Sequence, residues 1–267
     1  MHPILFEFGR FKLHSYGLMV FLAFALGWWL AMRRGKREGI NPAVISDLTL
    51  WIMVSGLLGA RLTYVAGHLS EFKGRWLDII SPIQSDGTIG IAGLVILGGF
   101  ISATGVGAWY LRRKGIAFLK MGDILAPSIA FGIAIGRIGC FLNGCCFGLP
   151  TNLPWGAHFP PDSLAGAVYP GVAIHPTQVY EFIYSSLIGL YLLYRTPRRK
   201  FMGELFLQLV ILYGFFRFFN EIVRHYESRH QIVIWDDIHL TGSMMVSVVM
   251  VALGLYFSYK LRRKNGG

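Results

Sequence analysis

Residues 123–143 read DILAPSIAFGIAIGRIGCFLN. One acid stands at the start of this stretch and one arginine near its end, and nearly everything between them is apolar or small. A helix that crosses a bilayer needs about 20 residues of this kind. The stretch therefore predicts a membrane-spanning helix, and Arg137 within it requires an explanation.

The rest of the chain repeats this pattern. Of its 267 residues, 54% are hydrophobic and only 15% are charged, with a mean hydropathy of +0.52, whereas soluble domains carry about 25% charged residues. We predict an all-α integral membrane protein that forms one domain over 1–267. It should have about seven transmembrane helices, at 15–32, 46–67, 88–111, 123–143, 177–194, 203–223 and 238–259.

The basic residues predict the orientation of these helices. Four Lys/Arg clusters follow the first, third, fifth and seventh predicted spans, at 33–37, 112–120, 195–200 and 260–264. Because such clusters stay on the cytoplasmic side, the N-terminus should lie outside and the C-terminus in the cytoplasm. The net charge of +11 then follows from topology, and we expect no nucleic-acid partner.

The segment 144–176 falls on the opposite side of the membrane in this topology. It holds six of the chain's eleven prolines, and such a density is typical of an irregular segment. We predict a small extracytoplasmic cap. The sequence contains no internal repeat, which removes the best sequence indication of an inverted-repeat transporter.

Three arginines, Arg61, Arg137 and Arg217, fall inside apolar spans or near their outer ends. An arginine at the centre of a span costs about 2.5–3.5 kcal/mol on insertion scales. A structural ion pair or contact with the interface could offset this cost, as could an anionic ligand. For Arg61 both interpretations stay open, and for Arg137 and Arg217 we favour a functional one.

The predicted sixth span supports that choice. At 100° per residue, its polar side chains lie within an arc of about 100° and form one polar stripe on an otherwise apolar helix. Glu221 follows Arg217 by one turn, so an i,i+4 ion pair is available. A single ion pair would not explain why three further polar residues lie on the same stripe. The stripe consists of Tyr213, Arg217, Asn220, Glu221 and Arg224.

The end of the predicted fourth span has its own composition. Residues 136–148 read GRIGCFLNGCCFG, with four glycines that predict a loosening helix whose free N–H groups could suit an anion. All three cysteines, Cys140, Cys145 and Cys146, lie here. They lack the two separated Cys/His pairs of a structural zinc site. We therefore expect no metal and no cofactor.

These residues resemble a known family, the prolipoprotein diacylglyceryl transferases. The run 136–148 is similar to the family signature GRxGxFxNGxxxG, and 175–181 (HPTQVYE) to its HPxQxYE. Residues 213–221 (YGFFRFFNE) are similar to YGxxRFxxE, and 16–19 and 59–64 also match family segments. The resemblance covers nearly the whole chain.

The resemblance implies a reaction and its partners. Such enzymes transfer the diacylglyceryl group of phosphatidylglycerol to the lipobox cysteine thiol of a preprolipoprotein signal peptide, forming a thioether and releasing glycerol phosphate. Because phosphatidylglycerol is a membrane lipid, the resemblance implies a location in the bacterial inner membrane. We expect a monomer. The family's two essential arginines correspond to Arg137 and Arg217.

We predict the following site from the motifs and the polar stripe. Arginines would hold the phosphate in a dry site, because guanidinium groups suit its developing charge. The catalytic set is Arg137, Arg217, Glu221, Tyr213 and His175. The substrate-binding set is Tyr16, Arg61, Gly98, Gly99, Asn143, Gly148, Gln178, Asn220 and Arg224.

Some positions depart from the family pattern. Many members have a histidine before a Gly-Gly pair in the third span, a candidate base for the thiol, and this chain has Leu97 there. His175 is then the next candidate base. Cys140 and Cys145 replace polar residues, and Met244 replaces a frequent glutamine. A family paralogue with another acceptor, or a lipid transporter or lipid-binding protein without catalysis, therefore remains an alternative.

Overall fold

The computed structural model describes residues 4–8, 11–79, 81, 93–226, 231–235 and 238–265. The chain divides into two compact units. The first comprises Met1–Ala31 with Gly122–Gly267, and the second comprises Met32–Met121.

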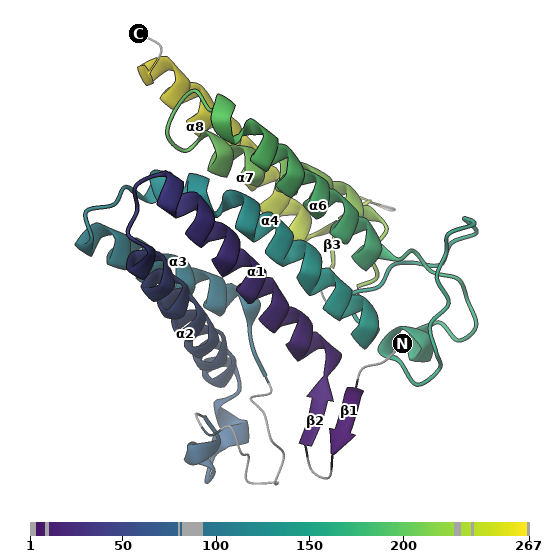
Figure 1. The fold of residues 1–267 in the computed structure, drawn as a ribbon. Helices are drawn as coiled ribbons and strands as arrows, with labels where there is room; N and C mark the ends of the chain where they lie inside the picture. Colours follow the sequence, from purple (N-terminus) through teal and green to yellow (C-terminus); the bar gives the residue numbers. More distant parts are fainter. Residues whose placement is uncertain are drawn as a thin grey trace. The chain divides into compact units, whose positions relative to one another are not determined.

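The first unit is a bundle of long helices, drawn side by side in Figure 1. It contains most of α1 (Ser15–Arg37) and of α4 (Phe118–Asn143), with all of α6 (Thr177–Arg195), α7 (Glu204–Ile222) and α8 (Gly242–Asn265). The segment between α4 and α6 is irregular apart from the short α5 (Leu164–Val168). The bundle therefore contains the segments 16–19, 136–148, 175–181 and 213–221 that resemble the family, whereas 59–64 belongs to the second unit.

Apolar side chains hold α4, α6 and α7 against one another. The contact is closest where Gly189 of α6 faces the ring of Phe131 of α4, since a Cβ there would come within 2.9 Å of the ring. Burial of such side chains away from lipid and water fixes the three helices as one body. The buried cluster is Ala126, Ala130, Tyr184, Ile188, Leu192, Leu205 and Leu209.

Asp123 ties α4 to the start of α7. Its side chain is fully buried and accepts hydrogen bonds from the backbone N–H groups of Gly203, at 2.7 Å, and Phe206, at 3.0 Å. A carboxylate at a helix N-terminus satisfies N–H groups that have no partner in the helix itself. Asp123 therefore caps a neighbouring helix.

Asp123→Ala should lower the free energy of unfolding by about 1–3 kcal/mol, because it leaves buried N–H groups unsatisfied. Thermal unfolding in detergent would measure the change. The exposed Asp162 provides the matched control, and Asp162→Ala should leave the stability unchanged. Equal stability of the two variants would contradict the capping role.

The second unit contains α2 (Pro42–Gly67) and α3 (Ile96–Arg113), with two short 3₁₀ helices after α2, η1 (Leu69–Phe72) and η2 (Trp76–Ile79). Glycines let α2 and α3 approach closely. A Cβ on Gly59 would lie 2.7 Å from the carbonyl oxygen of Gly98, and a Cβ on Gly98 would lie 2.7 Å from that of Gly59. This is the small-residue contact that membrane helices favour.

Five helices are long and apolar enough to cross a membrane within the residues that the structure describes: α1, α2, α4, α7 and α8. Each coincides with a predicted span. The two other predicted spans, 88–111 and 177–194, correspond to α3 and α6, which are helices but do not meet that criterion. Residues 88–92 of the third predicted span lie outside the described residues.

Two short antiparallel hairpins depart from the purely helical prediction. One pairs β1 (Ile4–Phe8) with β2 (Phe11–His14), and the other pairs β3 (Gln231–Trp235) with β4 (Ile238–Thr241). The predicted start of the seventh span at 238 is wrong for this reason, since 238–241 pair as a strand before α8 begins at Gly242. Apolar content alone does not separate such a strand from the first turn of a helix.

Candidate functional site

Glu181 of α6 is the centre of a buried polar cluster. Its side chain is 1% exposed, and its Oε1 forms an ion pair with Arg137 Nη2 of α4 at 3.0 Å and accepts a hydrogen bond from the Tyr213 hydroxyl at 2.9 Å. Its Oε2 accepts from Arg217 Nη1 at 3.1 Å and from Asn220 Nδ2 at 3.4 Å. One carboxylate therefore holds groups from α4 and α7 in fixed relative positions.

Glu221 forms the second half of the cluster. Its Oε2 lies 2.8 Å from Arg217 Nη2 and 3.9 Å from Arg224 Nη1, and its Oε1 accepts from the Thr241 hydroxyl at 3.1 Å. The predicted pair between Arg217 and Glu221 is thus present. Arg217 contacts Glu181 with one nitrogen and Glu221 with the other, so its planar guanidinium joins the two carboxylates.

Charge and exposure are distributed unequally in this cluster. Three guanidinium groups face two carboxylates, which leaves a net charge of +1 when all are ionised. The carboxylate side chains are at most 1% exposed, whereas those of Arg137, Arg217 and Arg224 are 19%, 11% and 13% exposed. An approaching anion would therefore meet guanidinium groups first, with the carboxylates behind them.

The segment after α4 packs onto the start of α6 and the end of α7. Thr177 and Gln178, in the first turn of α6, donate side-chain hydrogen bonds of 2.7 Å to the carbonyl oxygens of Cys146 and Cys145. Gly148 lies between two other backbone segments. A Cβ on Gly148 would lie 2.6 Å from the His175 carbonyl oxygen and 2.7 Å from that of Val223. Gly148 and Gln178 therefore fix the segment to the bundle.

The remainder of 144–176 has a small core of its own. Phe147 stacks on the ring of His225 with centroids 5.2 Å apart, and the Tyr169 hydroxyl lies 2.9 Å from His225 Nδ1. Four buried residues complete this core: Phe147, Phe159, Ala165 and Ile174. The segment is thus a folded structure attached to the end of α7.

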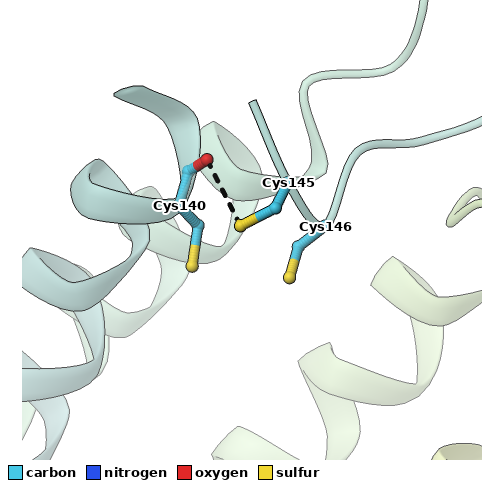
Figure 2. A group of neighbouring side chains, drawn as sticks. All are labelled: Cys140, Cys145 and Cys146. Atoms are coloured by element: carbon cyan, nitrogen blue, oxygen red, sulfur yellow. Dashed lines mark hydrogen bonds between the residues drawn. The ribbon is translucent and has the colours of Figure 1, made fainter. Parts of the chain in front are cut away.

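The three cysteines converge at the end of α4 (Figure 2). Their sulfur atoms all lie within 4.8 Å of one another, and Arg137 Nη1 is 3.8 Å from Cys140 Sγ. All three are free thiols. Cys146 has a φ of 62°, a left-handed conformation that costs a non-glycine residue about 1–2 kcal/mol.

Three other predicted residues of the first unit, Tyr16, Asn143 and His175, lie on or beside α4 and the segments that follow it. Tyr16 packs against Gly139 of α4, where a Cβ on the glycine would come 3.2 Å from the Tyr16 ring, and Asn143 is the last residue of α4. His175 Nδ1 lies 3.1 Å from the Tyr180 hydroxyl. Burial lowers the pKa of His175 and so favours the neutral form of its ring.

Three predicted residues belong to the second unit. Arg61 is buried, and its Nε donates to the Ile79 carbonyl at 3.0 Å while its guanidinium lies 5.0 Å from the centre of the Phe72 ring. These contacts hold the segment that follows α2. Gly98 and Gly99 form the close contact between α3 and α2. The structure thus gives all three a packing role in that unit.

Glu181 is the residue that sequence reasoning missed. It closes the run 175–181, but no role was predicted for it. A signal was available: an acid within the apolar span 177–194 is as costly as an intramembrane arginine and needs a partner of opposite charge. The i,i+4 spacing identifies Glu221 as a partner of Arg217, whereas Glu181 lies on another helix and pairs with Arg137 and Arg217 only through tertiary packing.

Comparisons with known proteins match almost the whole chain. The family profile described as prolipoprotein diacylglyceryl transferase matches residues 3–260. A phosphatidylglycerol–prolipoprotein diacylglyceryl transferase of Finegoldia magna is 32% identical over 99% of this chain and 97% of its own length. Proteins of the same name from Clostridium tetani and Thermosynechococcus vestitus are 30% and 34% identical, over 96% of this chain and over 96% and 91% of their own lengths.

Proposed function

Since the chain belongs to the prolipoprotein diacylglyceryl transferase family, we propose how its buried polar cluster performs that family's reaction. The chain is a transferase that moves the diacylglyceryl group of phosphatidylglycerol to prolipoproteins. Arg137 and Arg217 would hold the lipid phosphate, with Arg224 at the edge of the same site.

The net charge of the cluster carries this proposal. A phosphodiester has one negative charge, which would neutralise the +1 left by three guanidinium groups and two carboxylates. Arg137 uses Nη2 for Glu181, and its Nη1 meets only a sulfur atom, at 3.8 Å, among the described residues. Donors on the exposed side of the cluster are therefore available for phosphate oxygens.

The reaction then needs little more from the protein. The acceptor thiol would lose its proton, and its sulfur would attack the diacylglyceryl carbon that is bonded to the phosphate oxygen. As the thioether forms, the carbon–oxygen bond breaks and glycerol phosphate leaves with the electron pair. Fixed guanidinium groups stabilise the additional charge on that phosphate more than the charge of the starting diester.

Other residues of the cluster would position these groups. Glu181 and Glu221 orient Arg217, and Tyr213 shares Oε1 of Glu181 with Arg137. Asn220 links α7 to α6 through the Thr177 carbonyl, at 3.2 Å, and Glu181. His175, whose burial favours the neutral ring, is our candidate for the group that accepts the thiol proton, because a base must be unprotonated to act.

We also propose the membrane arrangement predicted from the sequence. The helix α3 has 18 residues and α6 has 19, which gives lengths of about 27 and 28 Å at 1.5 Å per residue, close to the thickness of the hydrocarbon layer. Seven spans in the bacterial inner membrane would then place the N-terminus and the 144–176 cap outside. The basic clusters at the C-terminal ends of α1, α3, α6 and α8 support this arrangement.

The direct test uses purified protein in lipid nanodiscs with phosphatidylglycerol and a lipobox peptide. The native chain should add a diacylglyceryl mass to the peptide and release an equal amount of glycerol phosphate. Arg137→Ala should lower the rate by about 100- to 1,000-fold, the usual effect of removing a transition-state donor.

The matched control is Arg198→Ala, which removes an exposed guanidinium that contacts Tyr194 and no carboxylate of the cluster. Its rate should equal that of the native chain. A native rate in the Arg137 variant would remove this arginine from the mechanism. No product from well-folded native protein with several lipobox peptides would instead favour another acceptor.

A further inference from the structure

The three cysteines form a group that the transfer reaction does not use. The acceptor supplies its own thiol, so no thiol of this chain is needed as a nucleophile. All cysteines of the chain nevertheless gather at one point, with their sulfur atoms within 4.8 Å of one another (Figure 2). Their sequence spacing does not match a four-ligand zinc motif, but distance, not spacing, decides whether side chains can share an ion.

We propose that Cys140, Cys145 and Cys146 bind one thiophilic metal ion of the Zn²⁺ class. In a tetrahedral site with Zn–S bonds of about 2.3 Å, the sulfur atoms lie about 3.8 Å apart. From a separation of at most 4.8 Å, each pair needs to close by about 1 Å or less, which side-chain rotation can supply. Three protein ligands leave the fourth position for water or an exogenous ligand, as in open zinc sites.

The backbone around the sulfur atoms is already fixed in place. Gln178 and Thr177 hold the carbonyl groups of Cys145 and Cys146 through hydrogen bonds of 2.7 Å each. Such contacts hold ligands in position before the metal arrives and are a general part of metal sites. The left-handed backbone of Cys146 is a strained conformation of the kind that gathers at ligand sites.

Charge also favours thiolate ligands at this point. Cysteines bind metals as thiolates, and a nearby cation stabilises that form. The guanidinium of Arg137 lies 3.8 Å from Cys140 Sγ. Binding a divalent ion would release three protons from the thiols and leave three thiolates and the ion with a net charge of −1, next to the positive charge of this guanidinium. Soft thiolate ligands select zinc-like ions over Mg²⁺ or Ca²⁺.

The test is a titration of the full-length protein in detergent with Cd²⁺, whose bonds to thiolates absorb in the ultraviolet. The protein is first reduced with a phosphine and then freed of it, and a thiol count of three confirms the starting state. We expect one Cd²⁺ per chain, displaced by Zn²⁺ and not by Mg²⁺.

Three single variants, Cys140→Ser, Cys145→Ser and Cys146→Ser, should each weaken Cd²⁺ binding by at least about 100-fold, because even outer contacts of a metal site contribute about 10- to 100-fold. The triple variant retains all eight histidines, so it measures binding elsewhere. The proposal is overturned if three titratable thiols give no Cd²⁺–thiolate absorption, or if the triple variant binds as tightly as the native chain. Transferase activity enters neither readout, so the outcome is independent of the role proposed for Arg137.

Discussion

Arg217→Lys should lower kcat/KM for diacylglyceryl transfer by about 100-fold or more, although it conserves the charge. The guanidinium of Arg217 reaches Glu181 with Nη1 and Glu221 with Nη2, at 3.1 and 2.8 Å. A lysine ammonium is a point charge that cannot keep both contacts and also present a planar face to phosphate. The loss of one fixed donor corresponds to about 100- to 1,000-fold in rate.

Arg195→Lys is the matched control. Arg195 at the end of α6 contacts Glu204 through one nitrogen, at 2.6 Å, and a lysine can replace a single contact of this kind. Transfer by this variant should remain at the native rate. Rates would be followed as glycerol phosphate release, normalised to folded protein. If Arg217→Lys were as active as Arg195→Lys, the two-carboxylate geometry of Arg217 would have no part in the reaction.

The helices could be predicted from the sequence because the bilayer allows few alternatives. A long apolar run must satisfy its backbone groups internally, so it forms a helix. The predicted span 203–223 and the observed α7, Glu204–Ile222, therefore agree to within one residue at each end. The strand pairs β1–β2 and β3–β4 could not be predicted in this way, since apolar content in a short segment does not decide between strand and helix.

The arginines of the site could be predicted from the sequence, but the residues that pair with them on other helices could not. Periodicity places Arg217 and Glu221 on one face of one helix, and the structure pairs them at 2.8 Å. No local pattern shows that Glu181 lies against both Arg137 and Arg217, because this depends on how α4, α6 and α7 pack. The same limit applies to the cysteines: their spacing along the chain argued against a shared ion, and the turn after α4 brings their sulfur atoms together.

Glu181→Gln should lower kcat by about 100-fold without raising KM for phosphatidylglycerol. The carboxylate holds Arg137 and Arg217 in position, and a neutral amide cannot accept from both and from Tyr213. Its loss raises the net charge of the cluster from +1 to +2, so attraction of the anionic lipid should persist or increase. Ground-state binding is then kept while transition-state alignment is lost, which appears in kcat.

The variant should also be less stable, by about 1–3 kcal/mol, because the partly buried Arg137 loses its carboxylate partner and Arg217 keeps only Glu221. Glu204→Gln is the control that separates the loss of stability from the loss of kcat. It breaks another buried ion pair, with Arg195, at the opposite end of α7 from Glu221, and should reduce stability with kcat and KM unchanged. A raised KM with native kcat in Glu181→Gln would mean that Glu181 supports lipid binding alone. Native values of both would mean that the guanidinium groups keep their positions without it.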